Sequence, residues 1–157
     1  MPIRMGMKPI LYAAAGLAVL GLLLAGCGGG TKQGPPLSKT QYLDEMKAIG
    51  TEIGDALSFV TTAATGKDAA SALERVRSTL GDAAKELSKM TPPPKATRAH
   101  AQLTAAVSRL ADQLDPVIVR LKSGNLNALG LVTSLKGFAA IQRAALALGR
   151  AGYDITA

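Results

Sequence analysis

One thiol and one imidazole are the side chains of this chain best suited to covalent or metal chemistry. Cys27 is the only cysteine and His100 the only histidine among 157 residues. A single cysteine excludes an intramolecular disulfide. Metal sites in helical proteins usually gather carboxylates and histidines from several helices, as in Glu-x-x-His pairs, and this sequence contains no such pair. Modification of the Cys27 sulfur is therefore the more promising chemistry.

Cys27 ends an N-terminal segment whose parts follow the order of an export signal. Arg4 and Lys8 supply positive charge, residues 10–24 are apolar, and small residues precede the cysteine. The apolar run is shorter than the ~20 residues that a membrane-spanning helix needs. We therefore favour a cleaved signal over two alternatives, an uncut signal anchor and an ordinary secretory signal followed by a structural cysteine.

The run Leu24-Ala25-Gly26-Cys27 resembles the lipobox of bacterial lipoproteins at all four positions. The resemblance implies that the Cys27 thiol carries a diacylglycerol, that signal peptidase II cuts between Gly26 and Cys27, and that the protein is anchored to the extracytoplasmic face of the cell membrane. Two acyl chains give stable anchoring where one gives marginal binding. The expected organisation is a signal peptide at 1–26, a lipidated cysteine and Gly/Pro tether at 27–37, and a helical domain at 38–157.

The charge balance is basic. The whole chain carries a net charge of +7, and because sixteen of its eighteen bases and all eleven acids follow Gly26, the predicted mature part carries +5. Such a balance suits an anionic membrane surface, a wall polymer or an acidic partner, and solubility explains it equally well. We expect no nucleic acid partner, since aromatic residues are too few for a base-stacking surface.

Two helices are predicted before the proline run at residues 92–94. Apolar residues recur at steps of three and four, and no strand-like alternation competes. Ser38 and Gln41 match a capping box for the first helix, which is expected to end near Thr65-Gly66. The second helix is expected to start at Asp68 or at Ser71.

Two further helices are predicted after the prolines. The unbroken periodicity of the third favours one kinked helix through Pro116. Asn125 is expected to cap a fourth helix that runs to about Gly149. Its expected inner stripe includes Leu129, Val132, Leu135, Phe138, Ala139, Ile141 and Ala145. Four amphipathic helices with short loops predict an all-α fold, an antiparallel up-down four-helix bundle.

The residues that could serve a catalytic or cofactor site have simpler explanations. His100 is interpreted as a structural histidine. A haem reading would use Met46 or Met90 as a further ligand, but Cys-x-x-Cys-His is absent and methionine at helical spacing usually fills a core. There is no Gly-x-Ser-x-Gly elbow and no phosphate-binding glycine loop before a helix. We expect no enzyme activity, cofactor or metal.

The predicted fourth helix carries a basic stripe. Lys136, Arg143 and Arg150 repeat every seven residues, with no acid between Asn125 and Tyr153. The stripe suits anionic lipid, a wall polymer or an acidic partner surface. The alternative is an ordinary solvated helix face.

The region after Cys27 resembles small lipoproteins of actinobacteria, through the runs Leu-Ser-Lys-Thr-Gln-Tyr, Thr-Pro-Pro-Pro, Leu-Lys-Ser-Gly-Asn and Gly-Tyr-Asp-Ile. The resemblance implies location and helical architecture. The resulting hypothesis is a non-enzymatic helical scaffold that binds another envelope component, which we expect to be a protein. The alternative is a carrier or sensor of a small apolar ligand or metal held between the helices.

Overall fold

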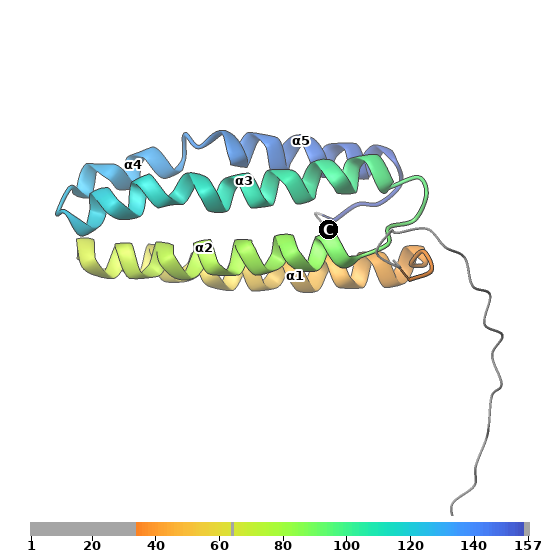
Figure 1. The fold of residues 1–157 in the computed structure, drawn as a ribbon, viewed down its shortest axis with the longest axis horizontal. Coiled ribbons are helices and arrows are strands. Elements are labelled where there is room, and N and C mark those ends of the chain that lie inside the picture. Colours follow the sequence, from red (N-terminus) through yellow and green to blue (C-terminus); the bar gives the residue numbers. More distant parts are fainter. Residues whose placement is uncertain (1–33, 64, 156–157) are drawn as a thin grey trace, which may run out of the picture. The chain divides into compact units, whose positions relative to one another are not determined.

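A computed structural model describes residues 34–63 and 65–155. Every regular element in these residues is helical, which confirms the all-α prediction for this part of the chain (Figure 1). The elements are α1 (Lys39–Thr61), α2 (Gly66–Lys89), α3 (Thr97–Lys122), the short 3₁₀ helix η1 (Leu126–Ala128), α4 (Leu129–Val132) and α5 (Lys136–Arg150). Gly26 and Cys27 lie outside the described residues.

The start of α1 has the predicted capping box. The Ser38 hydroxyl accepts the Gln41 backbone N–H at 3.3 Å, and the Gln41 side chain accepts the Ser38 backbone N–H at 3.1 Å. Two donors that a helix start would leave unpaired are thereby satisfied. Just before the cap, Leu37 donates its backbone N–H to the carbonyl oxygen of Thr91 at 2.9 Å, which joins the chain entering α1 to the loop after α2.

The turn between α1 and α2 differs from the prediction. The first helix ends at Thr61, earlier than expected, and the second begins at Gly66 rather than at Asp68 or Ser71. Thr65 is the cap, because its hydroxyl accepts the Asp68 N–H at 3.2 Å and donates to the Asp68 carboxylate at 2.6 Å. Asp68 also lies in the first turn, where negative charge is favourable.

The third helix is continuous through its proline, which confirms the single-helix interpretation. Pro116 is exposed. The carbonyl of Asp112, which loses its helical N–H partner there, belongs to an exposed residue. After α3, Gly124 adopts a φ of 89° and ends the helix in a left-handed conformation.

The predicted continuous fourth helix from Asn125 to Gly149 is wrong. The chain forms η1 and α4, is irregular at residues 133–135, and begins α5 at Lys136. Asn125 makes no side-chain capping bond. The predicted stripe is also rotated in part, since Ala139 is exposed whereas Gly137, Ala144 and Leu148 are the buried residues of α5.

Contact with α3 explains where α5 begins. The Gln113 side chain on α3 accepts the Gly137 N–H at 2.9 Å, so the new helix is capped by a neighbouring helix. A Cβ at Gly137 would lie 2.7 Å from Leu110 Cβ, a distance that only glycine can accommodate. The start of α5 is therefore fixed by contact with α3, whereas the sequence pattern predicted a local cap at Asn125.

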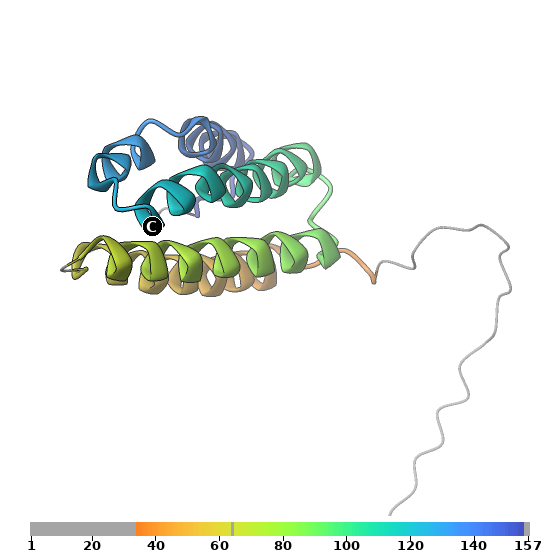
Figure 2. The same cartoon turned by 60° about the vertical axis from the view of Figure 1, so that its left-hand side comes forward.

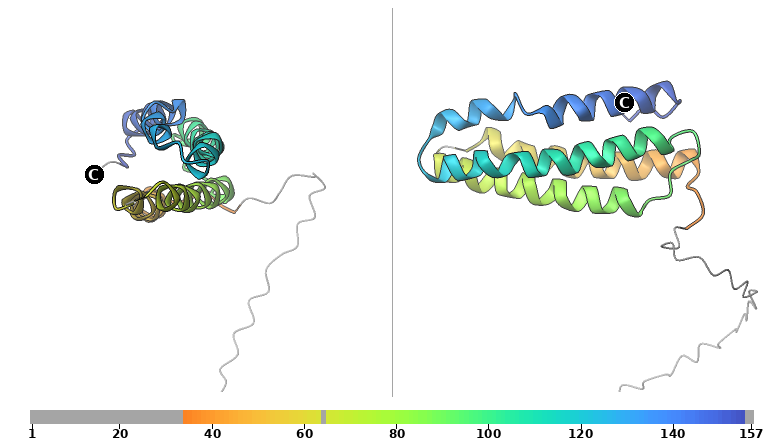
Figure 3. Two further views of the ribbon diagram at one scale, coloured as in Figure 1. Left: turned by 90° about the vertical axis from the view of Figure 1, so that its left-hand side faces the viewer. Right: turned by 45° about the horizontal axis from the view of Figure 1, so that its top comes forward.

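The helices lie in two groups. Figures 1 and 3 show α1 beside α2, and α3 beside α4 and α5; Figure 2 shows the same groups after rotation. Contacts are most extensive between α2 and α3, followed by α3 with α5 and α1 with α2. In the described part of the chain, α1 and α5 make no comparable contact.

Candidate functional site

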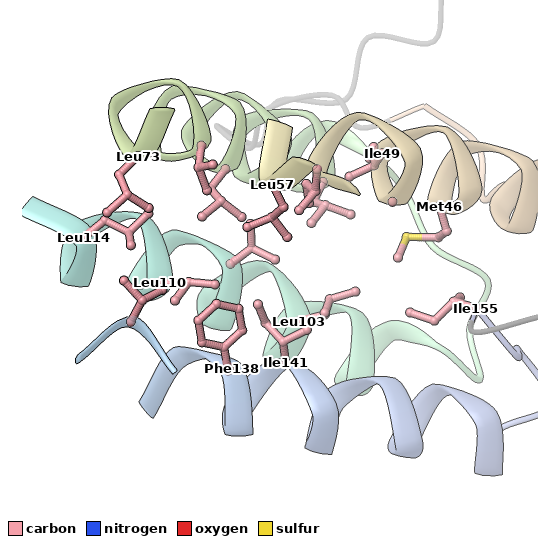
Figure 4. Close-up of a pocket in the computed structure, with 17 residues that line it drawn as sticks. Met46, Ile49, Leu57, Leu73, Leu103, Leu110, Leu114, Phe138, Ile141 and Ile155 are labelled. Carbon is pink, nitrogen blue, oxygen red and sulfur yellow. The ribbon is translucent and has the colours of Figure 1, made fainter. Parts of the chain in front are cut away.

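An apolar cavity of about 280 Å³ lies between the two groups of helices (Figure 4). Its walls come from α1, α2, α3, α4, α5 and Ile155. Among the described residues that line it, none carries a charge, a hydroxyl or an amide side chain. Figure 4 shows Leu57 of α1 pointing toward Phe138 and Ile141 of α5 across this space.

Helical periodicity brings these side chains together. Met46, Ile49, Ile53 and Leu57 recur along α1 at steps of three and four, which places them on one face. Apolar residues at the same spacing on α2 and α3 also reach the cavity. They contribute Leu73, Val76, Leu80 and Leu87 from α2 and Leu103, Val107, Leu110 and Leu114 from α3.

One side of the cavity wall is fully buried and the other side is partly exposed. All lining residues from α2 and α3 are buried. The half-buried lining residues come only from the remaining elements, and they are Ile53, Leu57, Val132, Phe138, Ile141 and Ile155. Since α1 and α5 also lack an extensive contact, the partly exposed side lies between these two helices, and we call it the α1–α5 seam.

A buried polar pair links α1 to α3. The Tyr42 hydroxyl lies 3.1 Å from His100 Nδ1, and His100 Nε2 lies 2.9 Å from the carbonyl oxygen of Leu87. A carbonyl can only accept, so Nε2 carries the proton and Nδ1 accepts from the tyrosine. The Leu87 side chain lines the cavity while its carbonyl holds the imidazole.

Burial keeps both members of this pair neutral near pH 7. It lowers the pKa of His100 below the ordinary 6.5, and the bond to Leu87 opposes that shift only in part. Burial, followed by electrostatic interaction with Tyr153, raises the pKa of Tyr42 to about 12. Tyr42 is fully buried and His100 is 5% exposed, which accounts for the dominant role of desolvation.

The chain after α5 covers this pair. The Tyr153 ring packs edge-on against the Tyr42 ring, with 5.5 Å between their centroids. The Lys39 Nζ atom lies over the Tyr153 ring, 5.9 Å from its centroid. Neither tyrosine was predicted as part of a site, because Tyr42 is far along the chain from both His100 and Tyr153 and no local pattern connects them.

His100 is therefore a structural histidine with both ring nitrogens engaged. No group of three or more metal-ligating side chains occurs within residues 34–63 and 65–155. Met46 lines the cavity and Met90 does not. Met90 lines a surface depression together with His100, and no hydrogen bond joins either methionine to the imidazole among the described residues.

The basic residues predicted on the fourth helix separate into two locations. Arg143 and Arg150 line one surface groove between α3 and α5, together with Arg109 of α3. Lys136 is exposed at the first position of α5 and does not line this groove. Sequence spacing alone could not identify Arg109, because it lies on a different helix.

Comparisons with protein-family models, with curated proteins and with solved structures find no match to this chain. Its chemistry must therefore be argued from the cavity, the seam and the charged surface.

Proposed function

We propose that this protein is a membrane-anchored carrier or sensor that holds a small apolar ligand between its helices. The apolar cavity of about 280 Å³ is the observation that carries the proposal. The proposed architecture is an antiparallel up-down four-helix bundle that is opened along one side. Contacts between successive helices along the chain support this architecture.

The lining limits the chemistry of the ligand. A charged or strongly polar group would lose its hydration without gaining a partner in this wall, at a cost of several kcal/mol. The volume is almost twice the ~150 Å³ of an engineered apolar cavity that stays dry and binds benzene. A hydrocarbon of two fused rings, or the end of an acyl chain, is the ligand class that this space suits.

The α1–α5 seam is the proposed route of access. Its lining residues are half-buried, so a modest separation of α1 from α5 would open the cavity without disturbing the buried leucines between α2 and α3. Helices that share few contacts separate at low free-energy cost. The ligand would therefore exchange through the side of the domain.

The location is proposed from the sequence. A diacylglyceryl anchor on Cys27 would hold the domain at the extracytoplasmic face of the cell membrane, where apolar molecules are concentrated. Binding of an envelope protein, the hypothesis first favoured by the sequence, stays a prediction beside this proposal.

The test fills the cavity from two sides. Val107→Phe on α3 and Val132→Phe on α4 place a larger side chain at lining positions, and Val119→Phe on α3 adds the same atoms at a residue that is 66% exposed. Naphthalene is added to the detergent-solubilised full chain and the midpoint of helix unfolding is measured by circular dichroism. A ligand that binds only the native state at a tenfold excess over Kd stabilises it by about 1.4 kcal/mol.

We expect naphthalene to raise the midpoint for the wild type and for Val119→Phe, and to raise it much less for the two filled variants. Val132 is half-buried, so its variant keeps the test decisive where the tightly packed Val107 position disturbs folding. An equal rise in all four proteins would place naphthalene outside this cavity, and no rise in the wild type would contradict binding of a fused-ring hydrocarbon there.

A further inference from the structure

A second surface feature lies on a different face of α5 from the cavity. Phe138 and Ile141 face the cavity, whereas Ala140, Arg143 and Ala147 line a groove between α5 and α3. The two sets differ by about half a turn of the helix, given 3.6 residues per turn. The groove is therefore separate from the proposed ligand site.

Three arginines converge on this groove from two helices. Arg109 comes from α3, and Arg143 and Arg150 come from α5. Among the described residues that line the groove, none is acidic; Asp154 lines an adjoining depression with Arg150. The ion pairs found among the described residues join Arg77 to Asp115, Lys85 to Asp82 and Lys122 to Glu74, and they involve none of these arginines. The groove is thus a local concentration of positive charge.

An apolar side chain stands among these charges. Leu146 lines the groove and is 61% exposed. Most of the remaining lining residues are alanines, whose small side chains keep the surface low enough for another surface to approach closely. The run Leu126–Arg150, which the structure divides into η1, α4 and α5, is apolar in composition for a surface segment, and little of it is buried.

We propose that this groove docks the domain onto an anionic phospholipid bilayer. Arginine forms paired hydrogen bonds to phosphate oxygens, and its long apolar stem suits the boundary between headgroups and acyl chains. Leu146 inserts at that boundary, as apolar residues of interfacial helices do. An acidic protein would satisfy the arginines, but it gives no reason for an exposed leucine in the same groove; the bilayer accounts for both.

The absence of tryptophan from the chain gives a clean reporter. Leu146→Trp places a single indole in the groove, and Phe59→Trp places one on α1 at a residue that is also exposed, at 49%. The full chain is reconstituted in vesicles of phosphatidylcholine alone and of phosphatidylcholine mixed with phosphatidylglycerol. We expect the emission of Leu146→Trp to shift to the blue and to be quenched by brominated lipid only in the anionic vesicles.

The matched controls separate docking from simple membrane attachment. Phe59→Trp should show no difference between the two vesicles, because its site lies on α1, away from the groove. Replacing Arg109, Arg143 and Arg150 by glutamine in the Leu146→Trp chain should abolish the shift, since each arginine near an anionic surface favours association about fivefold. Added salt should reverse the shift in the unsubstituted groove.

Two results would overturn the proposal. The first is identical Leu146→Trp emission in neutral and anionic vesicles, or a shift that survives the glutamine substitutions. The second is a shift produced by polyglutamate in neutral vesicles without any response to phosphatidylglycerol, which would assign the groove to an acidic protein. Both readouts are independent of naphthalene binding, so docking and ligand binding can fail separately.

Discussion

The interface between α2 and α3 and the seam between α1 and α5 face the same cavity but are built differently. The first contains buried leucines and valines and is crossed at its surface by ion pairs from Arg77 to Asp115 and from Lys122 to Glu74. The second has half-buried side chains and no extensive helix contact. We therefore expect substitutions in the α2–α3 interface to destabilise the domain more than substitutions in the α1–α5 seam.

The largest effect expected from this contrast is in the free energy of unfolding. Leu114 on α3 is 1% exposed and Leu57 on α1 is half-buried, yet both line the cavity. Leu114→Ala should cost about 2–5 kcal/mol, as for other buried leucines. Leu57→Ala should cost about 1 kcal/mol because it already exposes much of its surface. Urea unfolding measures both, and equal losses would contradict the contrast.

A smaller effect is expected where α5 meets α3. Gly137→Ala introduces a Cβ at 2.7 Å from Leu110 Cβ, so the two helices must move apart. Overpacking of this kind costs about 1–3 kcal/mol. Gly130→Ala on α4 is the matched control, since a Cβ there meets nothing within 4 Å. Unfolding in urea should leave the control near the wild type; a neutral Gly137→Ala would show that this contact does not hold α5.

The smallest effect is a pH dependence from the Tyr42–His100 pair. The pKa of His100 is lowered in the folded state, so the unfolded chain binds the proton more readily, and stability is lost as pH falls below the ordinary 6.5. Above that value the contribution of His100 is constant. Urea midpoints measured between about pH 8 and pH 5, where histidine is the main side chain to titrate, should fall toward the acid side.

The control for this prediction is His100→Gln, whose amide can donate to Leu87 and accept from Tyr42 without titrating. Its urea midpoint should change less over the same range. If both proteins show the same pH dependence, the imidazole is not the group responsible.

The helices could be predicted from sequence where local signals and tertiary contacts agree. Ser38 and Gln41 form the predicted cap, and the leucine stripes of the second and third helices reach the core. The prediction failed at the fourth helix because Gln113 and Gly137 meet across two helices. No periodicity within a single segment contains that information.

The candidate sites were less predictable for the same reason. The single histidine was interpreted as structural, but its partners Tyr42 and Leu87 come from other helices. Arg143 and Arg150 were selected by spacing, whereas Arg109 joins them only through packing of α3 on α5. The cavity depends on distances between helices, which composition does not specify.

The hydrogen bond from Leu37 to Thr91 has a mechanical consequence. Tension applied to the chain before α1 reaches this bond before it reaches the body of the helix. Part of the load therefore passes into the loop that joins α2 to α3, the two helices with the most extensive contact. A pull from the N-terminal side is thus shared between α1 and the loop after α2, instead of falling on α1 alone.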